Sequence, residues 1–385
     1  MCGIAGILAG SGDRDALRSR AAAMAACLEH RGPNDAGVDA GDGWALAMRR
    51  LAVQDTTAAG HQPMRLGDLS LVFNGEVYNF GELREELTGH GYHFRSRSDT
   101  EVVLAALEHW GTAALSRFNG MFALALVDRR RRTALLARDR FGKKPLFVAR
   151  LRDGVLFASE LKSLLRVARH ELTLCSEALA EYFRFGYVPA PRSIFREVTK
   201  LAPASFVEVD LDSGAVTEPA SFWSLPEAGA GPPGSSEEVL ATVRAAVRRR
   251  LVADVPVGAF LSGGTDSSLV VAGMTAAAAD VRTFSIGFAD PRFDESRYAK
   301  AVAAHLGTHH THQQLEWRDA MALVPALAAS YDEPFADSSA LPTLAVSRLA
   351  RQHVTVALSG DGGDELFGGY NRYFGAARLW SHLRK

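Results

Sequence analysis

The apolar and polar positions follow different patterns in the two halves of the chain. In the second half, short apolar runs alternate with stretches whose apolar residues recur at helical spacing, as in 298–306. Such alternation predicts an α/β domain with a doubly wound parallel sheet. The strands that we expect in this sheet are Val255–Leu261, Arg282–Phe288, His309–Leu315 and Val354–Ser359.

The first half contains the patterns of β-hairpins and of an amphipathic helix. The apolar runs Met121–Val127 and Thr133–Ala137 flank a stretch of arginines and predict the arms of one hairpin, and residues 204–223 predict another. A polar stretch rich in Gly and Pro, 227–236, is unsuited to packing and predicts a linker. We therefore divide the chain into a first domain, a linker and a second domain, at residues 1–215, 216–236 and 237–385.

Length, charge and cysteine content exclude several classes of protein. The chain has 385 residues, enough for about two domains with cores of their own. Its net charge of −1 gives no electrostatic argument for a nucleic-acid partner. No apolar run is long enough for a membrane span, and no signal-peptide pattern is present. Three cysteines are too few for a disulfide framework, so we expect a cytoplasmic protein.

Residues 262–268 read Ser-Gly-Gly-Thr-Asp-Ser-Ser and lie between a predicted strand and a predicted helix. Two glycines let the backbone turn its N–H groups toward one point, and a helix start adds positive potential there. The stretch can therefore bind an anion such as a phosphate. The alternative is a plain helix cap, because Asp266 and Ser267 are ordinary capping residues. No lysine follows the glycines, so the stretch differs from the G-x-x-x-x-G-K-[ST] phosphate loop.

A second glycine-rich stretch, 359–365, follows another predicted strand and carries Asp361, Asp364 and Glu365. Ligands of doubly wound sheets bind beyond the carboxyl ends of the strands, so we expect both stretches at one crevice. Carboxylates there repel phosphates unless a cation lies between them, and Mg²⁺ is usually held by one or two carboxylates together with phosphate oxygens. Asp266 and Asp364 are the candidate ligands, and a solvated turn is the alternative for the acidic stretch.

Cys2 becomes the first residue if Met1 is removed, and it then carries both a thiol and a free amine. An α-amino group has a pKa of about 7.7–8.0, so it can act as the base that activates the thiol. The alternative is that Cys2 is an incidental small residue.

Two other positions also allow two interpretations. Asn74–Gly75 either forms a hairpin turn or offers a side-chain amide and a backbone N–H to an oxyanion. Ser98 and Glu101 have the spacing of a capping box, which predicts a helix that continues through 102–110. Asp99 at its start either interacts with the helix dipole or binds a substrate amine.

Several motifs of the first half resemble the class II glutamine amidotransferases: MCGI at 1–4, HRGPN at 30–34, RRLAVQD at 49–55, FNGEVYN at 73–79, SDTEVV at 98–103, RDRFGKKPL at 138–146 and FASE at 157–160. The resemblance implies an α+β, four-layer αββα domain in which the nucleophile Cys2 hydrolyses glutamine. It implies that Asn74 and the N–H of Gly75 hold the oxyanion, while Arg50 and Asp99 bind the α-carboxylate and the α-amino group. The other glutamine contacts that it implies are Leu51, Val53 and Glu76.

The second half resembles the PP-loop synthetase domain of glutamine-dependent asparagine synthetases: SGGTDSS at 262–268, SIGF at 285–288, YDEPFADSSALPT at 331–343 and SGDGGDELFGGYNRY at 359–373. In that family, ATP converts aspartate into β-aspartyl-AMP with release of pyrophosphate, and ammonia then displaces AMP. The resemblance implies that Asp361 takes part in adenylate formation. It also implies ATP contacts from Leu261, Ser262, Gly263, Gly264, Asp266, Ser267, Ile286, Ser359 and Gly360.

Together the resemblances imply a ligase that amidates aspartate with ammonia from glutamine, with ATP as a substrate, Mg²⁺ as cofactor and a homodimer as a candidate assembly. Two alternatives stay open. The acceptor can be another carboxylate, or the protein can be a glutaminase whose second domain is not catalytic. Members of the family usually continue with further helices after the last motif, so the resemblance implies that the second domain is incomplete here.

Overall fold

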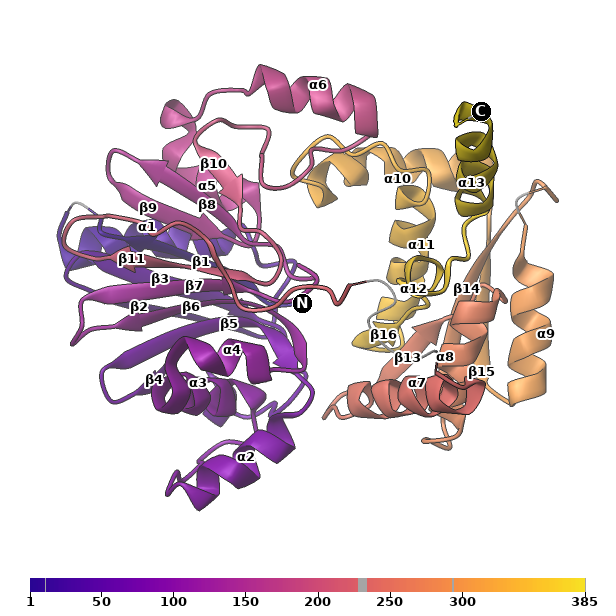
Figure 1. Ribbon diagram of the computed structural model, residues 1–385, viewed down its shortest axis with the longest axis horizontal. Coiled ribbons are helices and arrows are strands. Elements are labelled where there is room, and N and C mark those ends of the chain that lie inside the picture. Colours follow the sequence, from indigo (N-terminus) through magenta and orange to yellow (C-terminus); the bar gives the residue numbers. More distant parts are fainter. Residues whose placement is uncertain (11, 228–233, 293, 385) are drawn as a thin grey trace. The chain divides into compact units, whose positions relative to one another are not determined.

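A computed structural model describes residues 1–385 except residues 11, 228–233, 293 and 385. The chain forms two compact units (Figure 1). Unit 1 comprises Met1–Gly231 together with the later segment Ala329–Asp337, and unit 2 comprises Pro232–Ala328 and Ser338–Lys385. Part of the predicted linker, residues 228–233, lies outside the described residues.

Unit 1 contains two six-stranded antiparallel sheets. In spatial order, the first sheet consists of β10 (Val198–Lys200), β8 (Phe147–Leu151), β9 (Gly154–Ala158), β1 (Gly3–Leu8), β3 (Trp44–Arg50) and β2 (Asp35–Gly41). The second consists of β12 (Ala220–Ser221), β11 (Ser205–Asp210), β7 (Thr133–Arg138), β6 (Gly120–Asp128), β5 (Leu69–Val77) and β4 (Met64–Leu66).

Helices cover the outer face of each of these sheets (Figure 1). The α-helices of unit 1 are α1 (Arg14–Ala26), α2 (Phe80–Gly89), α3 (Asp99–Trp110), α4 (Ala114–Arg117), α5 (Leu161–Ala168) and α6 (Ser176–Phe185). Three short 3₁₀ helices accompany them: η1 (Ala58–Gly60), η2 (Gly111–Ala113) and η3 (Arg169–Glu171).

The period-2 alternation of β1 shows how the four layers form. Ala5 and Ile7 pack into a core with α1 and α5, whereas Ile4 and Leu8 point to the other face and pack against the second sheet. A third core lies between the second sheet and α2, α3 and α4. Unit 1 therefore has the αββα layering that the first resemblance implied.

Unit 2 is built on a parallel sheet with the order β15 (His309–Leu315), β14 (Arg282–Phe288), β13 (Val257–Phe260) and β16 (Val356–Leu358). Its helices are α7 (Ser236–Arg250), α8 (Thr265–Thr275), α9 (Ser296–Leu306), α10 (Trp317–Ser330), α11 (Ala340–Arg351), α12 (Gly363–Phe367) and α13 (Asn371–Leu383). None of the helices in the described part of the chain combines the length and hydrophobicity of a membrane span.

Helices lie on both faces of this sheet, as the doubly wound prediction requires. Ala259 packs with Val271 of α8 and Ala303 of α9, whereas Phe284 packs with Leu349 of α11. The chain adds β14 and β15 on one side of β13 and then returns to add β16 on the other. The carboxyl ends of β13 and β16 are therefore adjacent at a topological switch point, where such sheets bind ligands.

The structure contradicts two local interpretations of the sequence, a hairpin turn at Asn74–Gly75 and a capping box at Ser98 and Glu101. Asn74 and Gly75 pair with Ala123 and Phe122 inside β5, so the hairpin-turn interpretation is wrong. Ser98 caps α3 through the N–H of Thr100. Glu101 does not complete a capping box and instead accepts hydrogen bonds from backbone N–H groups of residues 95–96.

Candidate active sites

The register of β1 and β3 positions Cys2. Gly3 pairs with Arg49 in this antiparallel ladder, which brings the residue before β1 to the end of β3. The Cys2 Sγ lies 3.7 Å from the carbonyl oxygen of Leu51, in the loop after β3 that also carries Val53. Burial raises the pKa of the Cys2 thiol, and the positive charges of Lys144 and Arg50 oppose that rise. The thiol therefore depends on nearby cations or a base to become a nucleophile.

Asn74 lies in the middle of β5 with only 1% of its surface exposed. Neither the oxygen nor the nitrogen of its side-chain amide has a hydrogen-bond partner among the described residues. A buried amide without a partner costs about 1–3 kcal/mol, so such groups are rare unless a ligand completes them. The Asn74 amide is therefore available to donate to an oxyanion, as the resemblance implied.

Two carboxyl groups lie near the end of β5, those of the buried Asp99 and the half-buried Glu76. Burial and the negative charge of Asp99 raise the pKa of Glu76 to about 7. Burial also raises the pKa of Asp99 to about 6, although its carboxylate accepts a hydrogen bond of 2.9 Å from the N–H of Val77. A cation placed between these groups would offset their desolvation, and the α-ammonium of glutamine is such a cation.

Arg50 is buried at the end of β3, where its guanidinium holds the following loop. It donates to the carbonyl oxygens of Gln54, Asp55 and Thr57 at 3.1, 2.6 and 3.2 Å. A guanidinium has five N–H donors, so it can still bind a carboxylate while it holds the loop. The structure thus gathers Cys2, Arg50, Leu51, Glu76 and Asp99 around the ends of β1, β3 and β5.

Lys144 also belongs to this site, although the sequence did not single it out. Its side chain is 4% exposed, and burial, followed by the charge of Arg31, lowers its pKa to about 8. The negative groups that oppose this shift include Cys2 and Glu76. Asp139 holds the loop that carries Lys144 by accepting backbone N–H groups of Phe122 and of residues 141, 143 and 144. The available signal was the motif 138–146, which does not show which of its two lysines is buried.

In unit 2, residues 261–264 connect β13 to α8 in a tight turn, and residues 265–268 form the first turn of α8. Gly263 has φ +85°, and a side chain there would lie 2.5 Å from the backbone of α9. The Ser262 hydroxyl accepts the N–H of Gly264 at 3.2 Å and lies 3.0 Å from the Ser267 hydroxyl. Gly264 is the N-cap of α8, whose residues are all described, and no side chain caps this helix. The plain-cap interpretation of Asp266 and Ser267 is therefore wrong.

The glycine-rich stretch after β16 lies against this turn. A Cβ at Gly360 would lie 2.8 Å from the backbone nitrogen of Ser267, and one at Gly363 would collide with the Asp266 carboxylate. The two stretches can therefore lie this close because Gly360 and Gly363 have no side chains, which leaves space for Asp266. Leu261 and Ile286 belong to the adjacent strand ends, and the Ser359 hydroxyl donates to the Asp361 carboxylate at 2.9 Å.

The acidic side chains of the two glycine-rich stretches differ in direction. The Asp266 carboxylate lies against Gly363, between the two stretches, whereas an Asp364 oxygen lies against Gly369 in the turn after α12. Among the described residues, no group of three or more His, Cys, Asp or Glu side chains is arranged to hold a metal ion. Of the two predicted metal ligands, Asp266 therefore lies between the glycine-rich stretches, and Asp364 lies on the side of the turn after α12.

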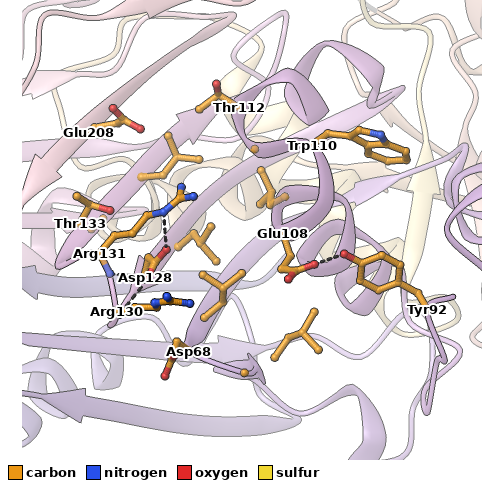
Figure 2. Close-up of a pocket in the computed structure, with 18 residues that line it drawn as sticks. Asp68, Tyr92, Glu108, Trp110, Thr112, Asp128, Arg130, Arg131, Thr133 and Glu208 are labelled. Carbon is orange, nitrogen blue, oxygen red and sulfur yellow. Dashed lines mark hydrogen bonds and ion pairs between the residues drawn. The ribbon is translucent and has the colours of Figure 1, made fainter. Parts of the chain in front are cut away.

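A cavity of about 940 Å³ lies elsewhere in unit 1 (Figure 2). Its walls carry Tyr92 beside Glu108 and Arg131 beside Asp128. None of the site residues predicted from the sequence lines it. The volume of this cavity therefore does not lead to the nucleophile that the sequence predicts.

Family models of known proteins match both halves of the chain. Residues 1–223 match the family model of a glutamine amidotransferase domain, and residues 238–385 match that of asparagine synthase. Asparagine synthetase [glutamine-hydrolyzing] 1 of Bacillus subtilis is 38% identical over 97% of this chain, which spans 59% of that protein's length. A solved glutamine phosphoribosylpyrophosphate amidotransferase from B. subtilis covers 90% of this chain and 96% of its own at 15% identity, with a TM-score of 0.48.

A putative asparagine synthetase [glutamine-hydrolyzing] 2 of Methanocaldococcus jannaschii is 35% identical over 98% of this chain, which covers 77% of that relative. These two relatives match nearly the whole chain, and the two family models together leave out only residues 224–237. The chain therefore belongs to the glutamine-hydrolysing asparagine synthetase family.

Proposed function

We propose that this chain hydrolyses glutamine in unit 1 and uses the ammonia to amidate the side-chain carboxylate of aspartate, which ATP activates in unit 2. The unpartnered, buried amide of Asn74 carries the first half of this proposal. The meeting of residues 262–268 with Gly360 and Gly363 at a switch point carries the second. The relatives named asparagine synthetase support the choice of acceptor.

The glutaminase reaction follows from the groups around Cys2. Arg50 binds the α-carboxylate, and Glu76 and Asp99 bind the α-ammonium, so the side-chain amide is presented to the thiol. Removal of Met1 gives Cys2 its own α-amine, and an ordinary α-amine, with a pKa of about 7.7–8.0, can take the thiol proton as Sγ attacks. Asn74 and the N–H of Gly75 stabilise the oxyanion, and ammonia leaves before water releases glutamate.

The synthetase reaction uses the loops at the switch point. Backbone N–H groups and the hydroxyls of Ser262 and Ser267 bind the pyrophosphate of ATP, with adenosine against Leu261, Ile286 and residues 359–360. An aspartate oxygen attacks the α-phosphorus, and pyrophosphate leaves. Asp361 assists adenylate formation, and ammonia then displaces AMP. Asp266, with Asp364 as the second candidate, would hold Mg²⁺, which neutralises phosphate charge when bound.

The choice of acceptor is tested by pyrophosphate release. With ATP, Mg²⁺ and glutamine present, we expect aspartate to trigger release, whereas glutamate and succinate do not. Release with another acid but not with aspartate contradicts the proposed acceptor. Glutamate formation without pyrophosphate release for any acid supports the alternative of a glutaminase with a non-catalytic second domain.

A second prediction concerns how kcat/KM for glutamine changes as the pH falls below neutrality. Below about pH 7, first Glu76 and then Asp99 take up protons, because both pKa values are raised. The protonated groups attract the α-ammonium less, so kcat/KM for glutamine falls as the pH decreases. We expect Asp99→Asn to lower kcat/KM at neutral pH and to make kcat/KM depend less on pH below neutrality. Asp35→Asn is expected to leave this pH dependence unchanged. A kcat/KM that stays constant down to about pH 5 contradicts these assignments.

The compartment and the assembly belong to the same proposal. Cys2, Cys27 and Cys175 are free thiols, which suits a reducing compartment, and we infer the cytoplasm. The homodimer stays a prediction.

A further inference from the structure

Unit 1 contains a segment that comes from the second half of the sequence. We call Ala329–Asp337 the docking segment, because it belongs to unit 1 while the chain on both sides of it belongs to unit 2. Glu333 forms an ion pair with Lys200 and accepts the backbone N–H of Ile194 at 2.8 Å. At its other end, the N–H of Ala336 donates to the carbonyl oxygen of Gly186 at 2.8 Å. The segment is therefore a built part of the amidotransferase unit.

A buried set of charges joins this segment to Glu160, the N-cap residue of α5. Lys162 lies 2.8 Å from a Glu160 oxygen and 3.2 Å from an Asp332 oxygen, and it donates to the carbonyl oxygen of Ala329 at 2.9 Å. The side chains of Glu160 and Asp332 are only 10% and 8% exposed. Because these ions are largely shielded from water, their attraction is screened less than that of a surface ion pair.

Glu160 also connects this set of charges to the nucleophile. Its other oxygen accepts a hydrogen bond of 2.8 Å from Arg31, and Arg31 Nε donates to the carbonyl oxygen of Cys2 at 2.8 Å. The backbone beside Glu160 pairs with β1 as well, since the N–H of Ser159 donates to the Ile4 carbonyl oxygen at 2.8 Å. A continuous path of contacts therefore leads from the docking segment to the main chain of Cys2.

The docking segment, Glu160 and Arg31 also enclose a cavity of about 300 Å³. Asp332, Glu333 and Lys200 line it from the side of the segment. One Asp332 oxygen that is buried there has no hydrogen-bond partner among the described residues. Lys162 is thus the cation that the structure offers to Asp332, and losing it leaves the largely buried Asp332 carboxylate uncompensated, whereas Glu160 still has Arg31 and His30 beside it.

We propose that Lys162 and Asp332 are positioning residues of the glutaminase site, which hold the Cys2 main chain through Glu160 and Arg31 only while the docking segment is in place. This inference rests on the proposed glutaminase function. The path sets the direction of the Cys2 carbonyl and, through the same backbone, of its amine and thiol. Arg50, Glu76 and Asp99 lie outside the path, so glutamine binding is retained when the path is broken.

The test uses the full chain and measures glutamate formation from glutamine without ATP. We expect Lys162→Met to lower kcat about tenfold and Asp332→Asn about threefold, with KM changed less than about twofold. The double variant is no slower than Lys162→Met, because both residues act through one path. Lys162→Arg keeps the charge and restores most of the rate. The rate at which iodoacetamide alkylates Cys2, measured by mass spectrometry, is expected to fall in the same order of variants as kcat. This measurement does not depend on glutamine hydrolysis.

A matched control is Arg132→Met, which removes an ion pair with Asp212 at the opposite end of the sheets and is expected to leave kcat and alkylation unchanged. Thermal unfolding shows whether each variant is folded. Folded Lys162→Met with wild-type kcat and alkylation rate overturns the inference, as does a raised KM with constant kcat. If the wild-type protein forms no glutamate, the proposed function fails, and the alkylation rates alone then decide whether the path positions Cys2.

Discussion

Replacing Cys2 by alanine is expected to reduce glutamate formation by at least about 10³-fold, while pyrophosphate release driven by added ammonium chloride stays near the wild-type rate. The thiol is the proposed nucleophile for the glutamine amide, and the proposed synthetase chemistry uses residues of unit 2. The Cys2 thiol donates to the Leu51 carbonyl oxygen, and the half-buried side chain packs at the edge of a core, so we expect the alanine variant to fold. Glutaminase and pyrophosphate assays on one preparation measure both effects.

The matched control for this variant is Cys27→Ala, because Cys27 is half-buried just after α1 and its thiol donates only to the carbonyl oxygen of Ala23. It is expected to keep both activities. Asn74→Ala gives an intermediate result, with kcat for glutamine lower by about 10²–10³-fold and KM nearly unchanged, because an oxyanion donor acts mainly in the transition state. Equal loss of ammonia-driven and glutamine-driven synthesis in Cys2→Ala contradicts the division of labour between the units.

The sequence predicted the strands of unit 2 more closely than the details of either site. Arg282–Phe288 and His309–Leu315 are confirmed residue for residue as β14 and β15. The first strand is shorter than predicted and begins at Val257, directly after Pro256, which cannot donate to a strand ladder. Periodicity thus located the strands because burial repeats along them, whereas their ends depend on single residues.

The spacing of residues in the sequence does not show whether a residue makes a local interaction or a long-range one. Asn74–Gly75 has the composition of a turn, yet pairing with β6 keeps it extended. Glu101 has the spacing of a capping box, yet the loop at residues 95–96 offers better placed N–H groups. In both cases a tertiary contact outweighs a local preference, and one sequence contains no record of that contact.

The same limit explains the residues that sequence reasoning missed. The sequence analysis gave Lys144 and Lys162 no role, and only the fold shows Lys144 buried and Lys162 held between two carboxylates. The docking segment is more than 120 residues from the strands it contacts, so its place in unit 1 follows from no local pattern. Resemblance identified the motifs that contain Lys144 and Asp332, but it gave neither residue a role.

Asp266→Asn is expected to lower aspartate-dependent pyrophosphate release by at least about 10²-fold and to leave glutamate formation from glutamine unchanged. The Asp266 carboxylate occupies the contact between the two glycine-rich stretches, so its charge acts where ATP phosphates and their cation are proposed to bind. Asp280→Asn, which changes an exposed carboxylate of unit 2 paired with His309, is the matched control and keeps both rates.

Gly363→Ala tests the same contact without removing a charge, because the added methyl group collides with the Asp266 carboxylate. Gly363→Ala is expected to weaken pyrophosphate release by disturbing the packing of the two loops. The isosteric Asp266→Asn variant removes the carboxylate charge and keeps this packing, so the two variants separate the effect of the charge from that of the loop geometry. If Asp266→Asn retains full release and Gly363→Ala abolishes it, Asp266 only fills space and the cation is held elsewhere. If both variants lose pyrophosphate release and keep glutaminase activity, the proposed role of Asp266 is supported. Its carboxylate then acts on the phosphates from the space beside Gly363.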